Sequence, residues 1–326
     1  MAGGSVANTA HAAEPKKDSD GYRKRLMPKA NKVGFVGLGA MGMGMATQLL
    51  KKGFQVGAVD TRAEIKERWT AAGGEWCDSP ASAAIDADVF VAMVVNAEQI
   101  ESVLFGENGA LKNLPSKSVV IATSTVSPAF SRGLGKRLAE SGHLFIDAPV
   151  SGGVVGAESG GLSIMASGSD EAFETGEPVL QAMAAKIYRI GTEPGLGSIV
   201  KTVNQLLAGS HIVLAAEAMA FGTRAGVDPQ VLFDVISHSA GSSWMFNNRV
   251  PHMLKGDFTP LSAVNIFVKD LGIVLDVAHE LRFPLPMAAI AHQLFLAAAA
   301  SGLGNQDDAS VVKVFENLSG ISVEKK

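Results

Sequence analysis

Cysteine is nearly missing from the 326-residue chain, in which Cys77 is the only one. A single thiol excludes an internal disulfide and a cysteine-rich metal site. It favours a reducing compartment, for which the cytoplasm is the default prediction. The seven histidines show neither H-x-x-x-H nor H-E-x-x-H spacing, so we expect no metal site.

An excess of one charge is also missing. The chain has 28 Lys and Arg against 32 Asp and Glu, which gives a net charge of -4. This balance provides no basic surface for a phosphate backbone, so we expect no nucleic-acid partner. Hydrophobic residues make up 47% and charged residues 18% of the chain, which predicts a folded protein, and its length predicts about two domains.

Long uninterrupted hydrophobic runs are absent as well. Leu206–Val227 and Leu285–Leu303 are the most apolar stretches, but His, Glu, Arg and Gln interrupt them. They are therefore predicted to be core helices, with no membrane partner. The first 32 residues carry seven Lys or Arg and three Asp or Glu, without the apolar stretch of a secretory signal. We predict that residues 1–31 form a disordered extension.

Short apolar, β-branched runs alternate with helix-like segments in the first part of the chain. The candidate strands are Val33–Gly37, Gln55–Asp60, Asp88–Val94, Ser118–Ser124, Leu144–Val150, Leu162–Ala166 and Lys186–Ile190. This alternation predicts an α/β fold, a Rossmann-type doubly wound and mostly parallel sheet, in a dinucleotide-binding domain over residues 32–194.

The strands then stop, and Ala, Leu, Met and Val recur at helical spacing almost to the end. This pattern predicts an all-helical substrate and dimerisation domain over residues 195–326. Its first helix, over 198–225, is long enough to link the two domains. Because these Ala-rich helices carry few charges, we expect a homo-oligomer, either a homodimer or a homotetramer.

A glycine-rich turn follows the first strand and opens a helix. It consists of Gly37, Leu38, Gly39, Ala40, Met41 and Gly42. Backbone amides at such a helix start are suited to a pyrophosphate. The second strand ends in Asp60, which can bind both adenosine ribose hydroxyls and would repel a 2'-phosphate, so we predict NAD as the cofactor. Arg62, two residues later, is the group that could instead attract the phosphate of NADP.

Two further segments combine reactive side chains with glycine. The run from Asp147 to Gly153 leaves a strand into a turn made of Ser151, Gly152 and Gly153, whose amides are suited to a carboxylate. The other segment opens the long helix and places Lys201, Asn204 and Gln205 on one face. Its apolar flanks Ile199, Val200, Val203, Leu206 and Leu207 predict partial burial, which would lower the pKa of Lys201 towards neutrality.

These motifs, with Ser124–Pro128 and Lys269–Leu271, resemble in type and order those of the β-hydroxyacid dehydrogenase family. The resemblance covers about residues 33 to 318 and implies that Lys201 is the catalytic acid and base. It also implies a substrate site with a carboxylate anchor and an orienting amide. The residues of that site are Ser151, Gly152, Gly153, Asn204, Gln205 and Asp270.

On the cofactor side, the resemblance implies that Thr125 lines the nicotinamide cleft and that Lys269 reaches the cofactor, beside the glycine turn and Asp60. Many members of the family carry two consecutive asparagines where this chain has Asn204 and Gln205.

Within the family, three segments are most similar to the L-threonate dehydrogenase branch: Met93–Ala97, Ala240–Phe246 and Gly256–Gly272. The branch implies NAD-dependent oxidation of a four-carbon sugar acid at C2, giving 2-dehydro-L-erythronate from L-threonate. The hydroxyls of Ser242 and Ser243 are candidate partners for a polyol tail. The alternatives are 3-hydroxyisobutyrate dehydrogenase, tartronate semialdehyde reductase and a non-catalytic dinucleotide-binding module.

Overall fold

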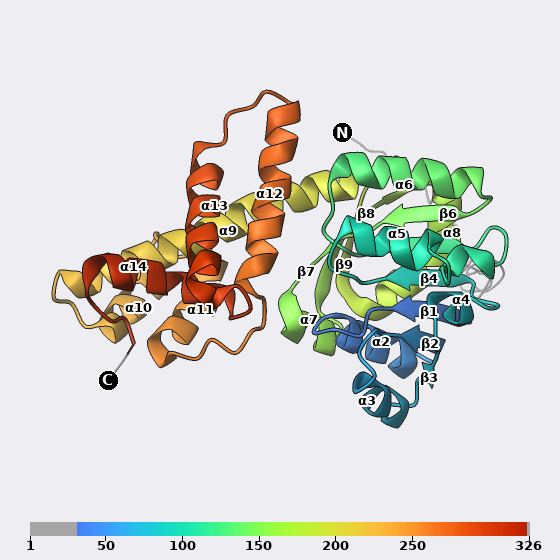
Figure 1. Ribbon diagram of the computed structural model, residues 1–326, viewed down its shortest axis with the longest axis horizontal. Helices are drawn as coiled ribbons and strands as arrows, with labels where there is room; N and C mark the ends of the chain where they lie inside the picture. Colours follow the sequence, from blue (N-terminus) through green and yellow to red (C-terminus); the bar gives the residue numbers. More distant parts are fainter. Residues whose placement is uncertain (1–30, 325–326) are drawn as a thin grey trace, which may run out of the picture.

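A computed structural model describes residues 31–324 of the chain. The predicted N-terminal extension lies outside these residues apart from Asn31. The chain forms an α/β half and a helical half, and the long helix α9 (Leu196–Arg224) runs from one to the other (Figure 1). This architecture confirms the predicted fold class.

The sheet of the α/β half has the strand order β3-β2-β1-β4-β5-β6-β8-β7, with β9 paired to β8. Strands β1 to β6 pair with one another in parallel, whereas β8 is antiparallel to β6 and β7 and parallel to β9. The strands are β1 (Lys32–Val36), β2 (Gln55–Val59), β3 (Glu75–Trp76), β4 (Val89–Ala92), β5 (Val119–Ala122), β6 (Leu144–Asp147), β7 (Val150–Ser151), β8 (Leu162–Gly168) and β9 (Ala184–Gly191).

Helices cover both faces of this sheet (Figure 1). The four central strands β1, β4, β5 and β6 are buried almost throughout, as continuous apolar strands between two helical layers should be. The helices are α2 (Gly42–Lys51), α3 (Ile65–Ala71), α4 (Pro80–Ala83), α5 (Ala97–Phe105), α6 (Pro128–Glu140), α7 (Gly153–Ser159) and α8 (Asp170–Met183).

The predicted strand Leu144–Val150 is wrong in one respect, because it divides into β6 and β7 at Ala148 and Pro149. Proline has no N–H for the ladder, and the chain turns here so that Val150 and Ser151 pair with β8 in the antiparallel direction. The short strand β3 was not predicted, since its two residues carry no readable alternation.

The helical half is built around α9, which contacts each of the other helices named here. These are α10 (Pro229–Ser237), α11 (Trp244–Lys255), α12 (Val264–Glu280), α13 (Pro286–Ala298) and α14 (Val312–Ser319). Their apolar faces form a second core around Ile212, Ala216 and Met219 of α9. The strands end at Gly191 and α9 begins at Leu196.

By length and composition, α9 and the run Pro286–Leu303 could each cross a membrane. The packing of α9 against both halves agrees with a core helix. The apolar residues that flank Lys201 were expected to be partly buried, and for three of them this is wrong: Ile199, Val203 and Leu207 are exposed. They share one face of α9 with Leu214 and Phe221, while Lys201 and Gln205 lie buried on another face.

The order of the strands determines where a ligand binds. Strands β1 and β4 are neighbours although they are not consecutive, and their chain connections leave in opposite directions across the sheet. In such sheets the crevice at the carboxyl ends of these two strands is the binding site. The predicted glycine turn follows β1 and therefore lies at this edge. The start of α9 also reaches it, since the Ser198 N–H donates to Asp147 at the end of β6.

Candidate active site

The glycine turn after β1 is shaped by three glycines with different surroundings. Gly37 has a φ of +94°, and a Cβ there would lie 2.1 Å from the Met93 carbonyl oxygen. A Cβ on Gly42 would lie 1.8 Å from the Gly37 carbonyl oxygen. A Cβ on Gly39 would meet only the Arg62 guanidinium, at 3.5 Å. Gly37 and Gly42 therefore make the tight turn, and Gly39 leaves room for a pyrophosphate against the backbone, as a dinucleotide requires.

Asp60 lies at the side of this turn. Its carboxylate accepts hydrogen bonds from the Leu38 N–H at 2.8 Å and from Nε of Arg62 at 3.0 Å. Arg62 Nη2 reaches the second carboxylate oxygen at 3.2 Å. Burial opposes ionisation of this carboxyl, but the hydrogen bonds from Arg62 and Leu38 outweigh it and lower the pKa of Asp60. The carboxylate is thus ionised at neutral pH, and Arg62 is paired with it.

Lys201 lies in the second turn of α9 and is only 7% exposed. Its Nζ donates a hydrogen bond of 2.8 Å to the carbonyl oxygen of Val150. Burial lowers the pKa of Lys201 to about 8, with Asp270 opposing this shift and Lys269 adding to it. An amine with this pKa exchanges protons readily near neutral pH, which is the property of a general acid and base.

The start of α9 is fixed to the sheet by Asp147, which is 1% exposed. Its carboxylate accepts hydrogen bonds from the N–H of Gly195 at 3.0 Å and from the N–H of Ser198 at 2.8 Å. The hydroxyls of Ser131 and Ser198 donate to its other oxygen. Burial raises the pKa of Asp147 despite these donors. No role for Asp147 was predicted from the sequence, although this residue opens the predicted carboxylate-binding run.

The predicted carboxylate turn comes directly after the acceptor of Lys201. Ser151 is partly buried, whereas Gly152 and Gly153 are exposed, with φ of +132° and +64°. Two consecutive residues at positive φ are accessible to glycine at little steric cost. The Lys201 amine therefore binds the peptide group that leads into this turn, a contact that could not be read from the sequence.

The remaining predicted polar residues form one hydrogen-bonded chain. The Asn204 side-chain amide donates to Gln205 Oε1 at 2.9 Å, and Gln205 Nε2 donates to Asp270 Oδ2 at 2.6 Å. Lys269 Nζ hydrogen-bonds to the other oxygen of Asp270 and to the Thr125 carbonyl oxygen, the latter at 3.0 Å. This chain links α9, α12 and the segment after β5.

The other candidate residues make no hydrogen bond to this cluster in the described part of the chain. The Ser243 hydroxyl caps α11 by accepting the Phe246 N–H, and Ser242 donates to Asn247, so both candidate polyol contacts bond within their own segment.

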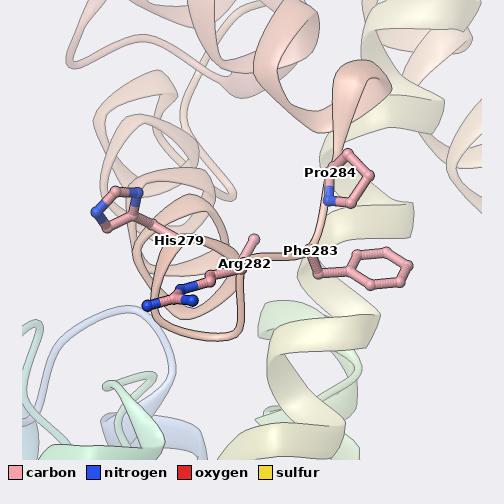
Figure 2. A pocket seen from close by; sticks show the side chains of 5 residues that line it. His279, Arg282, Phe283 and Pro284 are labelled. Carbon is pink, nitrogen blue, oxygen red and sulfur yellow. The ribbon is translucent and has the colours of Figure 1, made fainter.

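A pocket of about 480 Å³ at the turn between α12 and α13 is lined by Ala278, His279, Arg282, Phe283 and Pro284. None is a predicted site residue, and Figure 2 shows His279 and Arg282 pointing away from Phe283.

Comparisons with known proteins agree with this site. Residues 32–191 match the family model of the NAD binding domain of 6-phosphogluconate dehydrogenase. Residues 195–315 match the model described as NAD-binding of NADP-dependent 3-hydroxyisobutyrate dehydrogenase. The two models together account for both halves of the chain.

Individual relatives span nearly the whole protein. L-threonate dehydrogenase of Cupriavidus necator is 56% identical over 286 residues, covering 88% of this chain and 96% of the relative. The Escherichia coli K12 enzyme of the same name is 47% identical over 290 residues, covering 88% and 95%. The crystal structure of 3-hydroxyisobutyrate dehydrogenase from Salmonella typhimurium superposes with a TM-score of 0.83 at 45% identity, covering 87% and 99%. The chain thus belongs to the β-hydroxyacid dehydrogenase family and is an NAD-dependent dehydrogenase of hydroxy acids.

Proposed function

We propose that this enzyme oxidises L-threonate at C2 to 2-dehydro-L-erythronate, with Lys201 as the acid and base. The observation that carries the proposal is the buried Lys201 amine beside the Ser151–Gly153 turn, in a chain 56% identical to an L-threonate dehydrogenase. The base and the anchor for a 2-hydroxy acid then meet at Val150, whose carbonyl oxygen binds Lys201 and which precedes Ser151.

Each part of the site has a distinct task in this proposal. Ser151 and the amides of Gly152 and Gly153 hold the substrate carboxylate. The neutral Lys201 amine accepts the proton of the C2 hydroxyl as the C2–H bond breaks and the carbonyl forms. NAD, when bound, supplies the acceptor for the hydride. Asn204 and Gln205 orient the substrate, and the hydrogen bond from Gln205 to Asp270 holds the amide in place.

For the cofactor, we propose that Gly37 to Gly42, Asp60, Thr125 and Lys269 form the binding site and that NAD is preferred to NADP. The pairing of Arg62 with Asp60 supports this preference, because a paired guanidinium is not free to attract a 2'-phosphate. The ionised Asp60 would repel that phosphate.

We also propose that the protein is a homodimer or homotetramer built through its helical half. An apolar stripe on α9, made of Ile199, Val203, Leu207, Leu214 and Phe221, is 40% to 75% exposed. Spacings of four and seven residues place these side chains along one helix face. A continuous apolar face of this kind marks an interface.

Two further proposals concern organisation and location. The dinucleotide-binding domain comprises residues 32–194, and the substrate and dimerisation domain comprises residues 195–326, because each part has its own hydrophobic core.

The proposed compartment is the cytoplasm. Burial raises the pKa of Cys77 to about 11, so this free thiol stays protonated and unreactive.

The test is a panel of C3 to C5 hydroxy acids, each offered with NAD while NADH formation is followed by absorbance. The proposal expects the highest kcat/KM with L-threonate, above 3-hydroxyisobutyrate, D-threonate and glycerate, the reduction product of tartronate semialdehyde. A higher kcat/KM with 3-hydroxyisobutyrate or glycerate would transfer the function to that alternative. No activity with any member would leave the dinucleotide-binding module as the better description.

A further inference from the structure

The Ser151–Gly153 turn, proposed to hold the substrate carboxylate, contacts the cofactor side of the site through helix α7, which packs on α2. Helix α7 begins directly at this turn and packs on α2, which begins at the glycine turn. Their contact is close at Gly44: a Cβ there would lie 2.8 Å from backbone atoms of Ala157 and Glu158. Gly44 therefore allows the two helices to meet with no side chain between them.

One side chain completes this contact. Gln48 of α2 is 8% exposed, and its amide Nε2 donates a hydrogen bond to the backbone carbonyl of Glu158. That carbonyl belongs to the last turn of α7, where helix carbonyls lack partners within the helix. Gly160 ends α7 at a φ of +70°, and a Cβ on it would lie 3.3 Å from Gln48 Oε1. Gln48 thus contacts both the final turn of α7 and its cap.

The two contacts fix α7 at one end, and its other end is the carboxylate turn. With seven residues, α7 is about 10 Å long at 1.5 Å per residue, so a shift at Glu158 is passed directly to Gly153. We propose that Gln48 is a positioning residue for hydroxy-acid binding, which holds the Ser151–Gly153 turn in register with the cofactor helix. This rests on the proposed function, because it takes that turn as the carboxylate anchor.

The test is Gln48→Glu, which keeps the shape of the side chain and replaces the donor with a carboxylate facing the Glu158 carbonyl. Losing this hydrogen bond and adding the repulsion should raise the KM for the hydroxy acid about 10-fold, equivalent to about 1.4 kcal/mol. The kcat at saturating acid and the KM for NAD should stay within about 2-fold of wild type, because Lys201 and the glycine turn are untouched.

The matched control is Thr47→Ala, at the neighbouring position of α2. The Thr47 hydroxyl donates to the Met43 carbonyl inside the same helix, so its removal also takes one side-chain hydrogen bond from α2 but none from α7. The control should leave the KM for the acid unchanged. A merely structural role of Gln48 would lower the melting temperature without separating the KM for the acid from kcat.

Hydrogen exchange of residues 150–160 with NAD present provides a readout that needs no turnover. Exchange should be faster in Gln48→Glu and unchanged in Thr47→Ala. The inference is overturned if Gln48→Glu leaves either this exchange or the KM for the acid unchanged, or if it raises the KM for NAD instead. An inactive wild type would refute the proposed function, and unchanged exchange in Gln48→Glu would separately refute the contact.

Discussion

Replacing Lys201 with methionine should stop turnover and make the protein more stable at neutral pH. The change keeps an unbranched apolar chain in the buried position and removes the amine. Without a base for the hydroxyl proton, kcat should fall by about 10² to 10⁴-fold, the usual contribution of a general base. Binding of NAD should persist, because the glycine turn and Asp60 are untouched.

The gain in stability follows from the pKa of the amine. Burial holds the pKa of Lys201 at about 8, against 10.5 ordinarily. The unfolded chain therefore binds more protons between these values, and wild-type stability rises with pH through this window. This pKa difference destabilises the folded state by about 3 kcal/mol at pH 7 and by about 1 kcal/mol at pH 10. Methionine removes this cost but leaves the Val150 carbonyl without its donor, a loss of about 1 to 2 kcal/mol.

The assay is urea unfolding, followed by tryptophan fluorescence at pH 7 and pH 10, for wild type and variant. The stability of wild type relative to Lys201→Met should rise by about 2 kcal/mol between the two pH values. Lys136→Met is the control, since its side chain is 79% exposed, and it should show no such change. A pH-independent difference for Lys201→Met, or wild-type turnover in that variant, would refute the assignment. Wild-type oxidation should rise with pH and level off above about 8.

Three further outcomes follow from the site and the surface. Asp60→Ala frees Arg62 and removes the repelling charge, so the ratio of kcat/KM with NADP to that with NAD should rise about 10- to 100-fold; an unchanged ratio would mean that Asp60 does not select the cofactor. Ser151→Ala should raise the KM for the acid about 10-fold with kcat nearly unchanged, and steady-state kinetics with an equal fall in kcat would contradict its anchoring role. Leu214→Glu places a charge in the apolar stripe and should shift the protein to a smaller species in light scattering, whereas an unchanged mass would place the interface elsewhere.

The glycine turn and Asp60 could be predicted from the sequence because their signal is local. A strand, a tight turn and a helix follow one another, and the residue that ends the second strand is brought alongside by parallel pairing of β1 and β2. The helical half was equally readable, since its apolar residues recur at helical spacing. Both features depend on neighbours in the chain.

Contacts between distant segments could not be read in this way. The acceptor of Lys201 is a backbone carbonyl, that of Val150, and a backbone group has no residue-type signature. The partners of Asp147 come from α6, β8 and α9, so its role emerges only when the halves are assembled. The exposed side of α9 was misjudged because an apolar residue on the surface and one facing the core look the same in a sequence.

The fixing of α9 at its first turn has a mechanical consequence. The helix is unbroken from Leu196 to Arg224, so it moves as one rigid rod that pivots where its first turn is bound to the Asp147 carboxylate. Phe221 lies 26 residues beyond Gly195, about 39 Å along the axis. A tilt of about 5° at this pivot would move Phe221 by about 3 Å over this length. Any contact that restrains the C-terminal end of α9 therefore also restrains the angle at which Lys201 meets the sheet.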